Sequence, residues 1–405
     1  MLLALAWRNI WRQPRRTLLN VSSIAFAAMI MVFLLSFQLG TYATMKENVL
    51  RVMDGFAQVQ PPGYQDDPQI KRTIGDPDAV LARIESRDDL RAAPRGRSFA
   101  ILSDGEKSFG AAVVGVDPRR EVRVSTLANT VRKGRYLAPG DDNAVVLGSA
   151  LARNLGVAPG DTVSMLGQAR DSGIAADVLE VVGVFDTGTP ELDRQVAEVP
   201  LKRFQATFGM GKAVNVIALA APALADVTNA LPGLRRELAG HRLVLRSWRE
   251  LEPGLAAAIT LDLGTSMLWY ASLVIVVVFI ILNTLLMSVL ERTHEFGVLL
   301  AIGMRPGSLG AMIWLELGLL ALVGLAAGIA LGSAVTLAVA HYGLEMPGSE
   351  AMFAQWGLPG KLFPHLSVLS ACAGPAVMAA CILLAGIFPY RRAGALEPVA
   401  AMRAV

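Results

Sequence analysis

Few residues in this sequence of 405 residues have the type and spacing needed for catalysis or metal binding. Residues 41–266 contain one histidine, His241, and no cysteine, so a Ser-His-Asp arrangement would rest on one residue without a local signature. No GxxxxGK[ST] phosphate loop, HExxH zinc motif or GxSxG nucleophile motif occurs. The acidic pairs Asp66-Asp67, Asp88-Asp89 and Asp141-Asp142 are typical of solvated turns. We therefore predict no catalytic residue, no metal site and no cofactor bound by this chain.

One short segment has a pattern that suits protein binding. Residues 291–309 read ERTHEFGVLLAIGMRPGSL, with charges at the start followed by an apolar stretch. Phe296, Leu299, Leu300 and Gly303 follow the i, i+3, i+4, i+7 spacing of one helical face. A tight polar hairpin without a partner does not need such a face, and exposed apolar patches tend to mark partner sites. We therefore expect a partner at this segment.

The chain that carries this segment combines two kinds of sequence. Of its 71 charged residues, 55 fall in residues 41–266, where 27 basic residues nearly balance 28 acidic ones. With 53% hydrophobic residues and a mean hydropathy of +0.47, this distribution excludes a disordered chain, a collagen-like chain and a single soluble enzyme domain. The net charge of +3 is too small to indicate nucleic-acid binding.

Four apolar runs are long enough to be transmembrane helices, which need about 20 residues. We place them at 17–40, 267–290, 311–341 and 366–390. Backbone groups inside a bilayer must bond to one another, so helices are expected and strands are not. The first run continues well past Ala25-Phe26-Ala27, which resembles a cleavage site, and its length favours a membrane anchor over a cleaved signal peptide.

The lysines and arginines next to these runs predict their orientation. Four arginines lie in residues 1–16, whereas the loop 342–365 has only Lys361 against Glu345 and Glu350. The tail 391–405 contains three further arginines. By the positive-inside rule, both termini and the connection 291–310 are cytoplasmic, and residues 41–266 lie outside. Trp7 and Trp11 fit either a short interfacial helix or ordinary flanking residues.

Residues 41–266 predict an α+β domain, undivided or split into two subdomains. Asp76-Pro77 has the N-cap and following proline of a helix start. Short runs typical of strands are FGAAVVGVD, NAVVLG, DTVSML, DVLEVVGVFDTG, AVNVIALA and HRLVLRSW. Helix-like segments are GSALARNLG and ALADVTNALPGLRREL.

Several stretches resemble permeases of the MacB/FtsX group, the type VII ABC transporters. ERTHEFGVLLAIGM resembles the signature after their second span, and LAWRNIWRQPRRTLL at 5–19 resembles the approach to their first. VVGVDP, VVLGSALARNLGVAPGDTVSML and LEVVGVFDTG, within 113–188, resemble their periplasmic core domain, and FPYRRAGALEPVAAMR at 388–403 resembles their C-terminal end. SWRELEPGLAAAITLD at 247–262 favours the lipoprotein-releasing (LolC/LolE) branch.

The resemblance implies an α-helical membrane protein with four transmembrane helices in a 1+3 arrangement and a MacB-like periplasmic domain at 41–266. It implies an inner-membrane permease subunit paired with a separate ATP-binding subunit, which holds ATP and Mg, and with a second permease copy, identical or related. Such a complex would work by mechanotransmission. It would extract lipoprotein, or a similar acylated amphiphile, from the outer leaflet and pass it to a periplasmic carrier.

The resemblance also implies roles for particular residues. Residues 291–310 would include a coupling helix on the ATPase, with polar contacts from Glu291, Arg292 and Glu295, apolar contacts from Phe296 and Leu299, and close approach at Gly297 and Gly303. Methionine and aromatic side chains suit variable acyl chains, although the same residues are as typical of lipid-facing or packing positions. The candidate cavity residues are Met29, Phe33, Phe37, Tyr42, Met45, Met267, Tyr270, Leu273 and Val277.

Alternatives remain at this point. The substrate could be a peptide, a drug or a signal lipid, or the chain could be an FtsX-like signalling protein that controls a periplasmic partner. The outward domain is larger than the FtsX branch has, which argues against signalling. Glu316 lies near the start of the third span, where a charged carboxylate has a high free-energy cost unless it is paired. It could lie at headgroup level, form a salt bridge with Arg305 or the N-terminal arginines, or have a mechanistic role.

Overall fold

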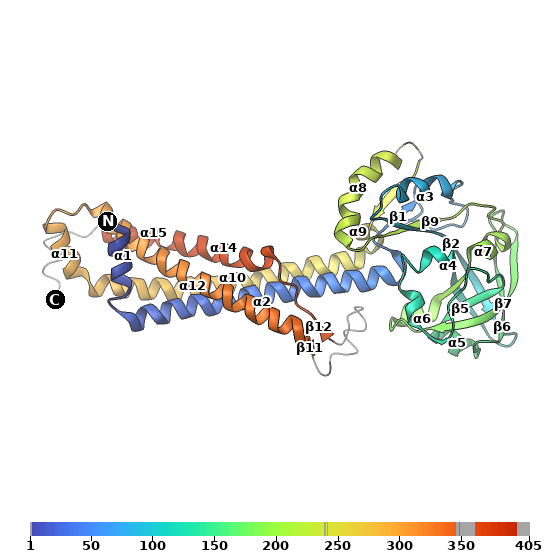
Figure 1. The fold of residues 1–405 in the computed structure, drawn as a ribbon, viewed down its shortest axis with the longest axis horizontal. Helices are drawn as coiled ribbons and strands as arrows, with labels where there is room; N and C mark the ends of the chain where they lie inside the picture. Colours follow the sequence, from blue (N-terminus) through green and yellow to red (C-terminus); the bar gives the residue numbers. More distant parts are fainter. Residues whose placement is uncertain (1, 239, 241, 346–347, 349–360, 395–405) are drawn as a thin grey trace. The chain divides into compact units, whose positions relative to one another are not determined.

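The computed structural model describes residues 2–238, 240, 242–345, 348 and 361–394 (Figure 1). The chain divides into two compact units. The helical unit contains residues 1–43, 259–346 and 361–405, and the sheet domain contains residues 44–258 and 347–360. His241, most of the loop 342–365 and most of the tail 391–405 lie outside the described residues.

The helical unit contains four stretches that are long and apolar enough to cross a membrane: Pro14–Asp54, Pro253–Glu291, Pro306–Tyr342 and Val368–Arg391. The helices α2 and α10 have 36 and 39 residues, so each exceeds the roughly 20 residues that a bilayer requires. The elements are α1 (Leu2–Ile10), α2 (Pro14–Val49), α10 (Pro253–Glu291), α11 (Thr293–Ala301), α12 (Pro306–Tyr342), α14 (Val368–Ala385), α15 (Ile387–Gly394) and the short strands β11 (Leu344–Glu345) and β12 (Lys361–Leu362).

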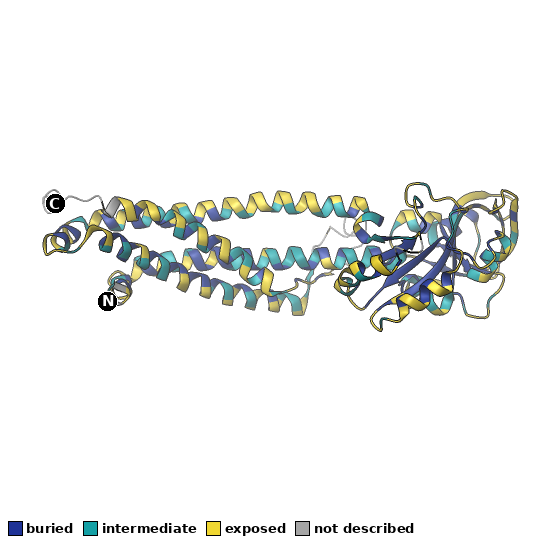
Figure 2. Cartoon of the chain, turned by 90° about the horizontal axis from the view of Figure 1, so that it is seen from above, coloured by how far each residue is buried: buried dark blue, intermediate teal, exposed yellow. Residues whose placement is uncertain are grey.

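Three glycines of α12 allow it to pack closely against α2. A Cβ atom built on Gly328 would lie 2.5 Å from Cβ of Ala28 and 2.6 Å from the Ala25 carbonyl oxygen. Gly324 and Gly332 meet α2 in the same way, one helical turn to either side. Spacing of small residues by four is typical of close helix packing in membranes. The helices still leave much of their surface exposed, as the yellow faces in Figure 2 show.

In the sheet domain, hydrogen-bonded pairing closes six strands into a ring in the order β2, β3, β8, β5, β7, β6 and back to β2. The first half of β2 also pairs with β9, which extends the sheet through β1 to β10, and β4 pairs with β7. The strands are β1 (Ala57–Gln60), β2 (Arg91–Ser103), β3 (Ser108–Val116), β4 (Val131–Gly134), β5 (Ala144–Gly148), β6 (Thr162–Gln168), β7 (Ile174–Phe185), β8 (Val196–Pro200), β9 (Val216–Ala220) and β10 (Val244–Ser247).

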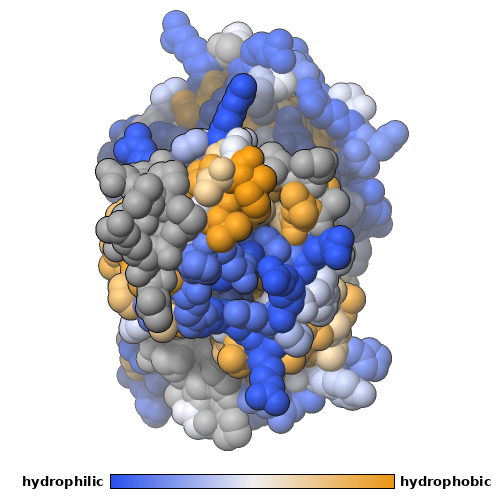
Figure 3. Space-filling view, turned by 90° about the vertical axis from the view of Figure 1, so that its left-hand side faces the viewer, coloured by the Kyte–Doolittle hydropathy of each residue, from blue (hydrophilic) through white to orange (hydrophobic). Residues whose placement is uncertain are grey.

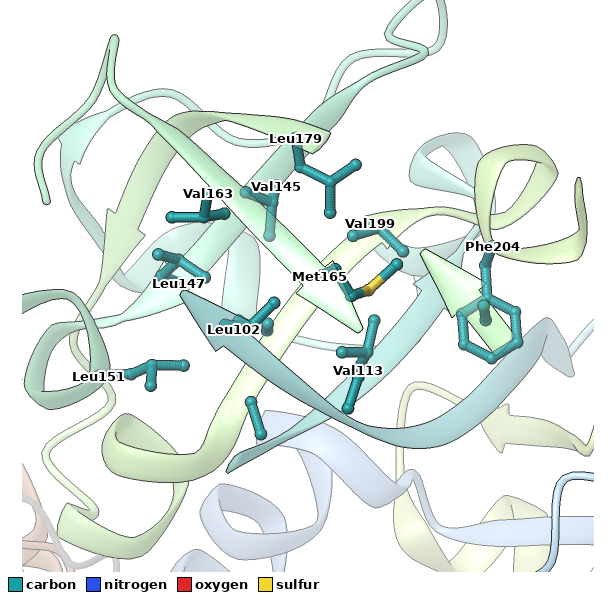
Figure 4. Close-up of a cluster of buried hydrophobic side chains, with 14 of the residues drawn as sticks. Leu102, Val113, Val145, Leu147, Leu151, Val163, Met165, Leu179, Val199 and Phe204 are labelled. Atoms are coloured by element: carbon teal, nitrogen blue, oxygen red, sulfur yellow. The ribbon is translucent and has the colours of Figure 1, made fainter. Parts of the chain in front are cut away.

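Alternate side chains of the ring strands point inward and fill its interior. Figure 4 shows Leu102 of β2, Val113 of β3, Leu147 of β5 and Met165 of β6 in one buried cluster. This core contains no disulfide, since both cysteines of the sequence lie on α14. Short helices cover the sheet: η1 (Leu50–Asp54), α3 (Pro77–Glu85), α4 (Pro118–Glu121), η2 (Leu127–Thr130), α5 (Ser149–Leu155), α6 (Pro190–Gln195), α7 (Leu201–Thr207), α8 (Leu224–Leu238) and α9 (Trp248–Leu251).

The start of α3 confirms the local prediction made for Asp76-Pro77. The Asp76 side chain accepts a hydrogen bond from the Ala79 amide at 3.2 Å, and Pro77 occupies the first turn. Such a cap satisfies an amide that the helix itself leaves without a partner.

Candidate functional site

The connection between α10 and α12 is built around α11. Helix α10 ends at Glu291, α11 runs from Thr293 to Ala301, and α12 begins at Pro306. Gly303 has φ +107°, which an L side chain rarely adopts, so a glycine is needed where the chain turns after α11. The segment predicted to bind a partner is therefore a short helix with a sharp turn at its end.

The apolar face predicted for this segment points into the helical unit. Phe296 is 1% exposed and belongs to the same buried cluster as Leu300 and Leu309, and Leu299 packs against that cluster. Gly297 is also buried. The expectation that Phe296 contacts a partner is therefore corrected, because its side chain stabilises the position of α11 on its own chain.

A different face of α11 is open. Val298 is 39% exposed and Ile302, just after the helix, is 80% exposed. His294 and Ala301 are exposed on the same side. Figure 3 views the end of the helical unit that carries α11 and shows hydrophobic surface beside hydrophilic side chains. An exposed apolar pair of this kind suits contact with another protein.

The charged residues of the segment pair with the N-terminal segment. Arg16 donates to both carboxylate oxygens of Glu291, at 2.7 and 2.9 Å. Glu295 accepts from Arg12 and from Arg292, each at 3.4 Å. Bidentate pairs of this kind fix orientation as well as distance. Glu291 thus connects α10 to the beginning of α2, and Glu295 connects α11 to the segment between α1 and α2.

Glu316 of α12 pairs with Arg292, at 3.6 Å, and not with Arg305 or the N-terminal arginines. The Arg292 guanidinium also lies 5.1 Å from the centroid of the Phe296 ring. A polar cavity of about 270 Å³ lies beside these groups, and Asn9, Asn20 and Ser288 are among its lining residues. Arg292 therefore links α11 to α12.

A second group of polar residues joins α2 to α10. The Gln38 amide nitrogen lies 2.6 Å from the Ser266 hydroxyl and 3.1 Å from the Asp262 carboxylate, and its amide oxygen accepts from the Tyr270 hydroxyl at 2.9 Å. The Tyr42 hydroxyl donates to Asp262. Polar groups between apolar helices are uncommon and hold the helices together.

The candidate cavity residues do not share one surface. Tyr42, Met45 and Val277 are buried, whereas Met267 is 66% exposed. Tyr270 and Leu273 pack against the helical core. Phe33 and Phe37 stack with ring centroids 6.1 Å apart, and Met29 lies beside Gly332.

Sequence reasoning missed Gln38, Asp262 and Ser266, although a signal was present. Asp262, Ser266 and Tyr270 are spaced by four residues and so lie on one face of a helix. Gln38 and Tyr42 have the same spacing on α2. Two matching polar rows on neighbouring helices are the pattern that could have identified the cluster.

The described residues contain no group of three or more His, Cys, Asp or Glu side chains that could hold a metal ion. In one of the acidic pairs, the Asp141 carboxylate accepts hydrogen bonds from both terminal nitrogens of Arg135, at 2.6 and 2.9 Å. These contacts show a structural role for that carboxylate.

Comparison with known families gives two adjacent matches. Residues 17–236 match the MacB-like periplasmic core domain, and residues 267–398 match the FtsX-like permease C-terminal region. The two matches lie on either side of the start of α10.

Three known proteins are among those similar to this chain. The chain is 24% identical over 409 residues to the lipoprotein-releasing system transmembrane protein LolC of Neisseria meningitidis serogroup B, covering 96% of this chain and 94% of that one. LolC of Xylella fastidiosa is 24% identical over 328 residues, 77% of each chain. The macrolide export ATP-binding/permease protein MacB of Rhodospirillum rubrum is 33% identical over 129 residues, 31% of this chain and 16% of that one.

Proposed function

Because this chain belongs to the family of FtsX-like ABC transporter permeases with a MacB-like periplasmic core domain, we propose that it extracts lipoprotein, or a similar acylated amphiphile, from the outer leaflet of the inner membrane. ATP hydrolysis in a separate subunit would drive this work, and a periplasmic carrier would receive the product. The observation that carries the proposal is the similarity to LolC through 96% of the chain. A second permease copy, identical or related, completes the complex.

The proposed topology has one span before the sheet domain and three after it. Both termini and α11 face the cytoplasm, and the sheet domain is periplasmic. The arginines at positions 8, 12, 15 and 16 support this orientation, since they precede the first span. The chain would bind no nucleotide, and ATP and Mg would belong to the partner subunit.

In this proposal the ATPase contacts α11 through its open face. Val298 and Ile302 would enter an apolar slot on the ATPase, while Phe296 and Leu300 hold α11 against the helical unit. The Arg16–Glu291 and Arg292–Glu316 ion pairs would make the connection between α10 and α11 move together with α2 and α12. A displacement of α11 would then reach the long helices without substrate crossing the membrane.

Acyl chains would bind near the first two spans. Each buried CH₂ group contributes about 0.8 kcal/mol, so a chain needs an apolar surface. Among the candidates, Phe33, Phe37 and Met267 are accessible to different degrees, and Met267 is the most exposed of them. The buried Tyr42 and Val277 would instead shape the helices behind that surface.

The test uses the complex of the permease with its ATPase subunit in proteoliposomes that contain a triacylated lipoprotein. We expect ATP-dependent release of lipoprotein and not of phospholipid. Val298→Asp combined with Ile302→Asp should abolish ATPase binding, because two charges would enter an apolar contact. Copurification of the two subunits measures this binding.

Val122→Asp is the matched control, since Val122 is 52% exposed in the sheet domain and its variant should bind the ATPase normally. If the α11 variant still binds the ATPase, the open face of α11 is not the contact with that subunit. If the complex hydrolyses ATP but releases no lipoprotein, the proposed substrate is wrong, whereas the assignment as a permease stands.

A further inference from the structure

The end of the first long helix enters the sheet domain through a short π-helical turn, η1. All five carbonyl oxygens of this turn have hydrogen-bond donors. The Gly55 amide donates to Leu50 at 2.7 Å, and the Thr126 amide donates to Arg51 at 2.8 Å. The other three donors are the Ser125 hydroxyl to Val52 at 2.7 Å, the Arg95 guanidinium to Met53, and the Gln58 amide to Asp54 at 2.9 Å. The last four carbonyls of a helix have no partner within the helix itself, so their bonds must come from elsewhere.

Of these five donors, only the Gly55 amide belongs to the residue that directly follows η1. The other donors come from β1, β2 and the segment after α4, which are parts of the sheet domain. Gly55 itself has φ +77°, and a Cβ atom there would lie 2.8 Å from the Leu219 carbonyl oxygen. The carbonyls of Arg51, Val52, Met53 and Asp54 are therefore bonded to other parts of the domain, and a glycine is needed at the exit of the turn.

Two arginines of β2 strengthen this attachment. Arg95 is 1% exposed and binds Glu121 of α4 through two bonds, of 2.5 and 3.0 Å, while it donates to Met53. Arg97 binds the Asp54 carboxylate at 3.0 Å. Positive charge at the carboxyl end of a helix is favourable because the helix dipole is negative there. A buried arginine that loses one partner leaves an unpaired charge, so these pairs resist separation.

The same carboxylate also meets the chain that leads into the second long helix. Asp54 forms a hydrogen bond with the side chain of Glu252, which directly precedes α10. Burial, together with the Asp54 charge, raises the pKa of Glu252 to about 7. The exit from α2 and the approach to α10 are thus in direct contact at one point of the sheet domain.

We propose that η1 with Arg95, Arg97 and Asp54, here called the η1 joint, is where movement of the first long helix is transmitted to the sheet domain. Arg95 and Arg97 are positioning residues in this role. Both lie on β2, the strand shared by the six-stranded ring and the β9–β1–β10 extension. A displacement of η1 therefore acts on the strand common to both parts. This inference rests on the proposed function.

The test measures distance changes in the whole complex. Cys372 and Cys381 are replaced by alanine, and spin labels are attached through Ser108→Cys in both permease copies. A second set of labels uses Ala43→Cys, which precedes the joint on α2. Distances are measured without nucleotide and with the ATPase trapped by ATP and vanadate. The joint is weakened by Asp54→Asn combined with Arg97→Gln, whose side chains are only about one-quarter exposed.

We expect trapping to shift both label distances in the otherwise unchanged chain. In the joint variant the shift at Ala43→Cys should persist, the shift at Ser108→Cys should fall at least twofold, and ATP hydrolysis should stay within twofold. Arg97→Lys alone keeps the positive charge beside Asp54, so its Ser108→Cys shift should be larger than that of the joint variant. The control is Arg72→Gln, which breaks a pair with Asp67 at 3.1 Å elsewhere in the domain and should change neither distance.

An undiminished Ser108→Cys shift in the joint variant would overturn the inference, as would loss of the shift at both positions. If the unchanged chain shows no nucleotide-dependent shift at all, mechanotransmission itself fails and the joint has nothing to transmit. Should the double variant not fold, Ser125→Ala removes one of the five carbonyl bonds without altering charge. That variant should reduce the Ser108→Cys shift while leaving the Ala43→Cys shift intact.

Discussion

At the scale of single residues, the sheet domain holds a carboxyl group that stays protonated near neutral pH. Glu198 of β8 is 2% exposed and accepts a hydrogen bond from the Tyr136 hydroxyl at 2.6 Å. Burial, followed by the nearby charge of Glu121, raises the pKa of Glu198 to about 8. Arg95 donates two hydrogen bonds to Glu121, so its positive charge is neutralised mainly by Glu121 and not by Glu198.

This pKa predicts a pH dependence of stability. The folded chain holds the Glu198 proton more tightly than the unfolded chain, whose carboxyl has a pKa near 4.5. The free energy of unfolding should therefore fall as pH rises from about 4.5 to about 8, by at most ~1.4 kcal/mol per pH unit for one proton. Glu198→Gln, which stays neutral, should gain stability over the unchanged protein as pH rises.

The measurement is the difference in thermal unfolding temperature between the two proteins in detergent at pH 5 and pH 8.5. Taking the difference removes the opposite contribution of two carboxyl groups whose pKa values are lowered. In Asp141 the hydrogen bond from Arg135 is the main cause. In Asp177 burial raises the pKa, but the hydrogen bonds from Arg203, Thr207 and the Val178 amide together lower it by more. Glu106→Gln in the exposed β2–β3 turn is the control and should show no such trend. A pH-independent difference for Glu198→Gln would contradict the prediction.

At the scale of elements, the contact between α2 and α12 depends on the absence of side chains. Gly328→Val should separate the two helices, because the new atoms would meet backbone atoms of Ala25 as well as the Ala28 methyl group. We expect a clear loss of stability, on the order of 1–3 kcal/mol, as for overpacking of a filled core. Thermal unfolding in detergent measures it.

Gly264→Ala in α10 is the matched control. Nothing lies within 4 Å of a Cβ atom at Gly264, and alanine is favoured over glycine inside a helix by about 1 kcal/mol. This variant should be as stable as the unchanged chain or more so. Equal loss of stability in both variants would show that the glycines of α12 have no special packing role.

The sequence predicted elements well wherever one physical effect dominates. Uncharged runs marked the four spans, but α2 and α10 extend beyond them because a helix can continue into charged residues such as Lys46 and Glu47. Strand β2 was not predicted, since Pro94, Arg95 and Arg97 interrupt the apolar pattern of a strand. Arg95 can be buried and Arg97 half-buried because Glu121 and Asp54, distant in sequence, neutralise them.

The candidate site shows a similar limit. Spacing correctly gave α11 an apolar face at Phe296, Leu299 and Leu300, but periodicity does not tell whether such a face covers the same chain or a partner. The open residues Val298 and Ile302 lie off that face and could not be chosen from spacing alone. Likewise, Glu291 and Glu295 could not be assigned to Arg16 and Arg12, because more than 250 residues separate them along the chain.

At the scale of the whole molecule, the proposed topology predicts which surfaces an impermeant reagent reaches. In a chain with Cys372→Ala and Cys381→Ala, Ser108→Cys in the sheet domain should react with an impermeant maleimide in intact spheroplasts. Ile302→Cys, next to α11, should react only after permeabilisation, although its side chain position is 80% exposed. The opposite labelling pattern would reverse the orientation and remove α11 from the cytoplasm.

The closed ring of strands has a consequence for how the protein matures. Its closing contacts join distant parts of the chain, since Ala100 pairs with Gly167 and Ala112 with Val196. Separations of roughly 70 to 85 residues make folding slow, because loop entropy is lost before the pairing can stabilise the product. A newly made chain would therefore expose unpaired strands after membrane insertion, and cellular chaperones and proteases would meet it in that state before any transporter has been assembled.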